Sequence, residues 1–416
     1  MMSTLIFMGF LGLMTAHVPS FFRGRPVEGI KDAGSRHVHR AIYGIEPKDK
    51  DAKDYPDVIK FQYDQKLVHS DNADTRTFKQ TAWYNSHYIK NKPANRAFDV
   101  VFLWIEVRYS KDKRSEIKDQ LREKAGPRTD GPDTMAANHS AHAFQLEHRC
   151  FGNSRPFNNL EISTLELCRI DDALEDVAAF INAMNTQYKF ASPKWVTFGA
   201  SYSGVLSALF RQKYPELTVG AVASSAPLKL TFDMWDYAYS MQQTYSTISG
   251  CAENIKAAFT AIQQATLTKE GREKLNKDLP HDPPMSDATR QIDIDNFFSN
   301  VFTVFQDVVQ YTFDGRSPIA NVWNIIKYVN RLPQNAKFAY KYDDMIRVLR
   351  NTTFDDESSW LANASNRGWL WLTCQQLGFQ QTTDLGRNIF GQILPINYYM
   401  TTCRDAFNLS FAEQIK

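Results

Sequence analysis

One serine of this sequence stands where acyl-transfer chemistry is possible. The segment Gly199–Gly204 (GASYSG) follows an apolar, strand-like run and precedes a helical pattern. A serine on such a sharp strand-to-helix turn presents its hydroxyl at the edge of the sheet, and the next backbone N–H points to where a tetrahedral oxyanion would form. The pattern predicts Ser201 as a nucleophile and the Tyr202 N–H as an oxyanion donor. The common form of this turn has glycine two residues after the serine, whereas here Ser203 stands there.

The elements around this turn predict an α/β fold. Continuous apolar, β-rich runs such as Val100–Ile105 (VVFLWI) suit strands that are buried on both faces of a mostly parallel sheet. The segment from Val27 to about Asn95 is polar and predicts irregular structure with short strands. Further elements around the turn are expected as strands over Ala143–Leu146, Trp195–Phe198 and Val219–Ser224, and as helices over Ile170–Ile181 and Gly204–Tyr214.

The pattern becomes helical beyond Pro227. Helices are expected at Ile255–Gln264, at Asp295–Tyr311 with Asp295 as the N-cap, and at Ile319–Val329. Because no strand–helix alternation resumes before about Asn351, we expect a separate helical unit inserted after the last strand.

Several charged groups predict solvated surface rather than chemistry. The charge-rich run Arg108–Asp133 predicts a solvated helix and loop. His281, in the sequence HDPP, is interpreted as a surface loop residue rather than a catalytic base. The helix dipole favours carboxylates near a helix start, so we interpret four of them as a solvated helix start: Asp171, Asp172, Glu175 and Asp176.

Composition and the N-terminus narrow the class of protein. The 416 residues are 43% hydrophobic, as in a globular protein, and their net charge of +2 argues against nucleic-acid or membrane-surface partners. The uncharged run Leu5–Ala16 predicts a signal peptide over residues 1–16 and is too short to span a bilayer, and no other stretch could cross a membrane. Glycosylation sequons suit the same secretory route, at Asn138, Asn351, Asn363 and Asn408.

The cysteines predict disulfides and no metal site. No Cys-X-X-Cys or Cys/His cluster has zinc spacing, so neither a metal nor a cofactor is expected. Disulfides are permitted in a secreted protein, and the sequence leaves their pairing open. One bridge is expected among Cys251, Cys374 and Cys403, and the two remaining cysteines are Cys150 and Cys168.

The chain resembles a family of serine peptidases. Gly199–Pro227 (GASYSGVLSALFRQKYPELTVGAVASSAP) resembles the nucleophile region of the family that contains prolyl-carboxypeptidase, dipeptidyl-peptidase II and the thymus-specific serine protease. Four further stretches are similar to family signatures in the same order: GRP at 24–26, QKLVH at 65–69, FQLEHRCFGNSRPF at 144–157 followed by DDALEDVAAFI, and WLTCQQLGFQQTTD at 371–384.

The resemblance implies an α/β-hydrolase core over residues 17–227, incomplete at its C-terminal end, and an inserted helical cap over residues 228–416. It implies that Ser201 is the nucleophile and that the Tyr202 N–H binds the oxyanion. The family removes a residue or a dipeptide from one end of short proline-containing peptides, in lysosomes or outside cells. A secreted or lysosomal exopeptidase is therefore expected. The sequence leaves open whether the protein forms a homodimer.

This chain departs from the family pattern at three places. The family carries its Asp and His in motifs downstream of the QTT segment, whereas this sequence ends at Lys416 without them, which predicts an incomplete gene model or an alternative transcript. Glu106 to Tyr109 replaces a glycine-rich turn of the oxyanion site. Cys150 and Asn153 replace an aromatic residue and a glutamate.

Three hypotheses follow. The first is a serine exopeptidase whose base lies outside these residues. The second is a non-catalytic relative that binds proline-containing peptides. The third is an esterase or lipase on the same fold, since a fold does not fix a function.

Overall fold

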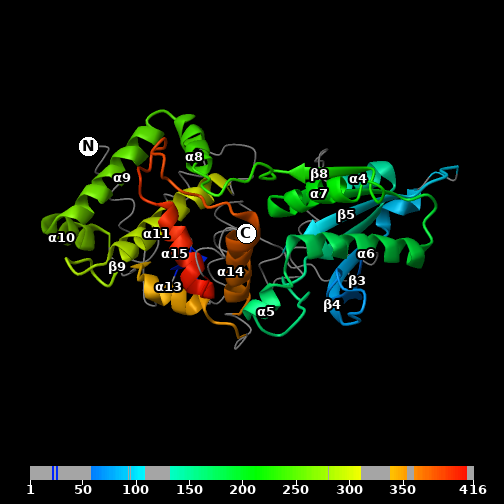
Figure 1. Cartoon of the computed structure of the whole chain (residues 1–416). Coiled ribbons are helices and arrows are strands. Elements are labelled where there is room, and N and C mark those ends of the chain that lie inside the picture. The colour runs from blue at the N-terminus through cyan, green and yellow to red at the C-terminus, as the bar shows by residue number, and fades with distance from the viewer. Residues whose placement is uncertain are drawn as a thin grey trace. The chain divides into compact units, whose positions relative to one another are not determined.

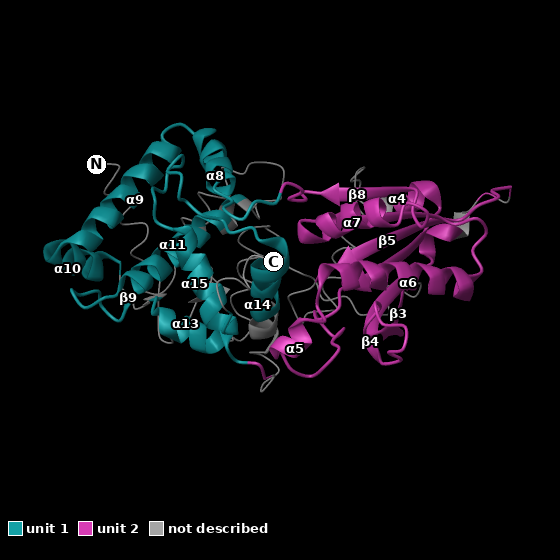
Figure 2. Cartoon of the chain, viewed as in Figure 1, with its two compact units in different colours: residues 1–46, 230–351, 355–416 teal, residues 47–229, 352–354 magenta. Residues whose placement is uncertain are grey.

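A computed structural model describes residues 21–22, 25–26, 58–91, 93, 95–107, 132–279, 281–310, 338–353 and 360–409. The chain divides into two compact units (Figure 2). The sheet unit comprises Pro47–Lys229 and Thr352–Phe354, and the helical unit comprises Met1–Glu46, Leu230–Asn351 and Asp355–Lys416. The turn at Ser201 belongs to the sheet unit.

A six-stranded mixed sheet is the centre of the sheet unit. Its strand order is β3-β4-β6-β5-β7-β8, in which β4 runs antiparallel to both neighbours and the other pairs are parallel. With the strand–turn–helix around Ser201, this is the predicted α/β-hydrolase core (Figure 1). The strands are β3 (Val58–Lys66), β4 (Thr77–Asn85), β5 (Val100–Glu106), β6 (His142–Glu147), β7 (Lys194–Ala200) and β8 (Gly220–Ser224).

The structure confirms the predicted strands and corrects the N-terminal region. Strands β5 to β8 lie where the apolar runs indicated. The prediction of irregular structure with short strands is wrong for β3 and β4, which have nine residues each. The many polar side chains of β3 and β4 led to this wrong prediction, but some of them are buried and hydrogen-bonded. Gln65 donates to Gln80 over 2.8 Å, and Gln80 donates to the Glu147 carbonyl over 2.8 Å.

Helices cover this sheet. The predicted amphipathic helix is α6 (Ile170–Tyr188), which buries one apolar side and packs on β3, and α7 (Tyr202–Lys213) packs on β7 and β8. The sheet unit also contains η2 (His87–Asn91), α4 (Pro132–His139) and α5 (Ile162–Leu165). The charge-rich run 108–133 lies outside the described residues, except for the start of α4.

The helices of the helical unit follow β8 in the chain. Within the described ranges, no helix is both long and apolar enough to cross a membrane. Short strand pairs join β1 (Phe21–Phe22) to β2 (Arg25–Pro26), and β9 (His281–Asp282) to β10 (Phe338–Ala339). The helices are α8 (Asp236–Ser246), α9 (Cys251–Leu267), α10 (Lys269–Asp278), α11 (Gln291–Gln310), α13 (Tyr342–Leu349), α14 (Trp360–Leu372), the π-helical turn η3 (Thr373–Leu377) and α15 (Ile396–Phe407).

Two predictions in this unit are corrected, and one lies outside the described residues. Asp295 is not an N-cap, because α11 already begins at Gln291 and the Gln291 amide donates to the Asp295 carboxylate over 2.8 Å. His281 is not a surface residue, since only 3% of it is exposed. Its Nδ1 donates to the Leu279 carbonyl over 2.5 Å. The helix predicted at 319–329 lies outside the described residues.

One disulfide lies in each unit. Cys150–Cys168 joins the segment after β6 to the segment before α6, and Cys374–Cys403 joins η3 to α15 as the bridge expected in the helical part. Cys251 is a free, half-buried thiol.

We expect Cys150→Ala/Cys168→Ala to lower the free energy of unfolding by about 3 kcal/mol, because the bridge closes a loop of 18 residues and restricts the unfolded chain. Urea unfolding measures the change. Cys251→Ala is the matched control and should change stability by less than about 1 kcal/mol. A double variant as stable as the control would contradict the expectation.

Candidate active site at the strand–helix turn

The turn at Ser201 holds an unusual backbone conformation. Ser201 lies directly between β7 and α7, with φ 57° and ψ −126°. A non-glycine residue held at such angles costs about 1–3 kcal/mol, so neighbouring contacts must fix it. The Ser201 N–H donates to the Ser224 carbonyl over 2.9 Å, and the Ser201 carbonyl accepts from the Val205 N–H over 3.1 Å. The Ser201 side chain itself is exposed. The turn thus presents a hydroxyl at the carboxyl end of the sheet.

Gly199 allows the chain to turn this tightly. A Cβ atom on Gly199 would lie 2.0 Å from the carbonyl oxygen of Ser203 and 2.7 Å from the nitrogen of Gly204. Both are backbone atoms, which cannot rotate away as the end of a side chain can. Glycine at 199 therefore lets the first turn of α7 approach β7.

We expect Gly199→Ala to destabilise the protein by about 2 kcal/mol, because the added methyl group forces the turn apart. Gly220→Ala is the matched control, since its Cβ would meet only Val196 methyl groups at 3.9 Å. Thermal unfolding of the two variants measures the difference. Equal stabilities would show that the turn can relax around the methyl group.

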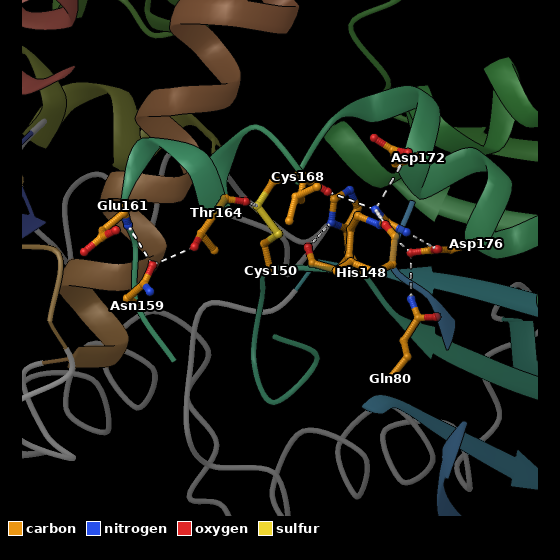
Figure 3. The surroundings of a disulfide bond; sticks show 12 residues. Gln80, His148, Cys150, Asn159, Glu161, Thr164, Cys168, Asp172 and Asp176 are labelled. Atoms are coloured by element: carbon orange, nitrogen blue, oxygen red, sulfur yellow. Dashed lines mark hydrogen bonds and ion pairs between the residues drawn. A yellow bond between two sulfur atoms is a disulfide. The ribbon is translucent and has the colours of Figure 1, made fainter. Parts of the chain in front are cut away.

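The block Glu147–Arg149 begins with the last residue of β6 and lies beside this turn. The Glu147 carboxylate accepts from the Asn153 N–H over 2.9 Å and from the Ser154 hydroxyl over 2.7 Å. Asn153, where the resemblance predicts a glutamate, thus contributes its backbone here. Cys150, where the resemblance predicts an aromatic residue, forms the disulfide with Cys168 shown in Figure 3.

Arg149 and Asp176 form a buried ion pair. Arg149 is 0% exposed and donates to the two carboxylate oxygens of Asp176 over 2.7 and 2.5 Å. Asp176 also accepts from His69 Nε2 over 2.7 Å, and Gln80 lies beside it (Figure 3). The prediction of a solvated carboxylate is therefore wrong for Asp176. Its burial has a reason: α6 turns this residue toward Arg149, whereas Asp171 on the same helix is exposed.

His148 lies between this ion pair and the turn. Its Nδ1 is 2.6 Å from the Arg149 carbonyl oxygen, and its Nε2 is 3.2 Å from the Tyr202 hydroxyl. Burial lowers the pKa of His148 to about 4, although Asp176 acts in the opposite direction. The ring is therefore neutral at physiological pH.

This pKa predicts a pH dependence of stability. Between about pH 6.5 and pH 4 the unfolded chain binds a proton at His148 and the folded chain does not. The contribution of neutral His148 to the free energy of unfolding is therefore complete above pH 6.5 and is lost as the pH falls toward 4. Wild type should lose about 2 kcal/mol more than His148→Gln between pH 7 and pH 5. Chemical unfolding at the two pH values measures this. Equal losses would show that His148 titrates normally.

The other predicted residues are accounted for as follows. Tyr202 is the first residue of α7 and is 4% exposed. Glu106 ends β5 opposite Glu147, and residues 108–131 lie outside the described residues. Burial lowers the pKa of His281, which belongs to the helical unit. Within the described part of the chain, no histidine ring is hydrogen-bonded to Ser201, and no cluster of His, Cys, Asp and Glu could hold a metal ion.

Comparison with known proteins decides the family. The sequence model of the family described as serine carboxypeptidase S28 matches residues 65–416. The chain belongs to this family. The S28 match includes the turn at Ser201 and the block at Glu147, and it confirms the resemblance to serine peptidases. As a member, the chain is a serine hydrolase of the peptidase type.

Individual S28 relatives are similar over most of the chain. A Caenorhabditis elegans protein named "Putative serine protease F56F10.1" is 35% identical over 95% of this chain and 74% of its own length. The thymus-specific serine protease of Mus musculus is 24% identical over 82% of this chain and 68% of its own. An acetylester hydrolase structure from Corynebacterium glutamicum covers 87% of this chain and 98% of its own, with 11% identity and a TM-score of 0.29. The assignment of the fold rests on the sheet and the turn, not on that last likeness.

Proposed function

We propose that this S28 protein is a serine exopeptidase of short proline-containing peptides, with Ser201 as its nucleophile. The observation that carries the proposal is the strained backbone of an exposed serine at the end of β7, because such strain persists only where the surroundings enforce it. The Ser201 hydroxyl oxygen attacks the scissile carbonyl, the C–N bond breaks, and the hydroxyl proton passes to the departing amine. Water then hydrolyses the acyl-enzyme, which releases the carboxylic acid and returns a proton to Ser201. The Tyr202 N–H, in the first turn of α7, donates to the oxyanion of the tetrahedral intermediate.

The family membership and the sequence support the rest of the proposal. Residues 1–16 act as a signal peptide, residues 17–227 form the hydrolase domain and residues 228–416 form the cap. The protein then resides in the secretory pathway, outside the cell or in lysosomes. Exposed Asn138 and Asn408, both in glycosylation sequons, suit that compartment.

Labelling by a fluorophosphonate tests the nucleophile. The intact, deglycosylated mass of the native protein is measured first, and its C-terminal peptide is sequenced. The native protein is then treated with the reagent and digested. We expect the label on the peptide that contains Ser201. A folded protein that takes no label would refute the proposal and favour the non-catalytic relative.

A substrate panel tests the specificity. Peptides with proline next to either terminal bond are compared with the same peptides carrying alanine and with acyl esters. Cleavage of one terminal bond in the proline peptides alone supports the exopeptidase and tells an aminopeptidase from a carboxypeptidase. Turnover of esters without peptides would contradict it. A melting temperature raised by proline peptides without cleavage would support the binding relative instead.

A further inference from the structure

His148 has a defined proton arrangement although it takes no part in the proposed chemistry. A carbonyl oxygen only accepts hydrogen bonds, so Nδ1 must donate to the Arg149 carbonyl, 2.6 Å away. In a neutral ring Nε2 then carries the lone pair. It follows that the Tyr202 hydroxyl donates to Nε2 over 3.2 Å. His148 therefore acts as an acceptor aimed at the residue that follows Ser201.

The surroundings fix this acceptor in place. His148 is 3% exposed, and its ring and the Phe151 ring form a T-shaped pair with centroids 5.2 Å apart. The Arg149 side chain donates to Asp176 and to three backbone carbonyls, those of Lys66, Leu67 and Leu167. Arg149, whose own carbonyl orients His148, is thus held in place by hydrogen bonds to β3 and α6. The ring cannot turn without disturbing these contacts.

Tyr202 connects His148 to the turn at Ser201. Its ring is buried, with its centroid 5.7 Å from that of His148, and its own backbone opens α7. The N–H groups in the first turn of a helix point out of its N-terminus, where an anion is favoured. A phenol held at both its ring and its hydroxyl leaves the attached backbone little freedom. Displacing an oxyanion donor reduces the stabilisation of the transition state and hardly changes substrate binding, because the substrate carbonyl carries much less charge than the oxyanion.

We propose that His148 is a positioning residue that holds the Tyr202 hydroxyl and thereby fixes the Tyr202 N–H where the oxyanion forms. This inference rests on the proposed function and deepens it. It assigns a task to the histidine of the Glu-His-Arg block, which takes no part in bond making. His148 never touches the substrate in this role.

Four variants test it: His148→Leu, His148→Gln, Tyr202→Phe and the double variant His148→Leu/Tyr202→Phe. Leucine removes the acceptor, whereas the glutamine amide oxygen can replace Nε2. We expect His148→Leu and Tyr202→Phe each to lower kcat about 10- to 100-fold with KM changed less than about threefold, since losing an oxyanion donor entirely costs 10²–10³. His148→Gln should recover most of kcat. The double variant should be no slower than the slower single variant.

Amide hydrogen exchange separates this inference from the proposed function. In His148→Leu the peptide covering residues 199–205 should exchange faster, while the peptide at the end of α7 should not change. If wild type neither cleaves peptides nor takes the fluorophosphonate, the proposed function fails, and the exchange still shows whether His148 holds the turn. Unchanged exchange at 199–205 overturns the inference. So do multiplicative losses in the double variant, or a Gln variant as slow as the Leu variant.

Discussion

Ser201→Ala should lower kcat for a proline-containing peptide by about 10⁶-fold, which is the size of effect seen when a nucleophilic serine is removed from a serine peptidase. The loss should fall on kcat, because the methyl group still leaves the site open to the substrate. The reason is chemical: without the hydroxyl no acyl-enzyme forms, and only the binding and oxyanion contributions remain. Steady-state kinetics with a discontinuous product assay measures it.

Ser203→Ala is the matched control for this experiment. Ser203 lies in the same motif but is only 9% exposed, and its side chain has no place in the proposed chemistry. It should keep its fluorophosphonate labelling and most of its turnover, with an unfolding temperature like that of Ser201→Ala. If Ser201→Ala retained activity while Ser203→Ala lost it, the nucleophile would be misassigned.

The strand–turn–helix around Ser201 could be predicted because its signals are local. The apolar run of β7, the small residues of the turn and the periodicity of α7 all lie within about twenty consecutive residues. Such a segment has the same pattern whatever the rest of the chain does. The composition of the buried strand β5 was informative for the same reason.

The polar interior of the sheet unit could not be predicted, because its partners are distant in sequence. Gln65 and Gln80 lie on different strands, and polar side chains in a strand indicate solvent unless a partner is known. Asp176 has the same local sequence context as exposed Asp171, and only its pairing with Arg149, 27 positions earlier, distinguishes them. The role of His148 depends in turn on that pairing. The pairing of the disulfides was open for the same reason.

The Arg149–Asp176 pair should therefore be the most sensitive point of the scaffold. We expect Arg149→Met to lower the free energy of unfolding by about 3–5 kcal/mol, because it leaves the buried Asp176 carboxylate with His69 and Gln80 as its side-chain partners among the described residues. Arg149→Met/Asp176→Leu should recover most of this loss, since replacing both charges by apolar groups removes the unpaired carboxylate. Chemical unfolding of the full chain measures all three proteins.

An exposed ion pair between α6 and α7 provides the comparison that decides the cause. Lys213 lies 2.8 Å from Asp171, with side chains 37% and 70% exposed, so Lys213→Met should cost less than about 1 kcal/mol. A similar loss in both single variants would mean that burial is not what makes Arg149 important. A double variant less stable than Arg149→Met would show that the pair is worth more than the apolar contacts replacing it. In either case the charges of the ion pair, and not the packing around it, would hold Arg149, whose carbonyl orients His148.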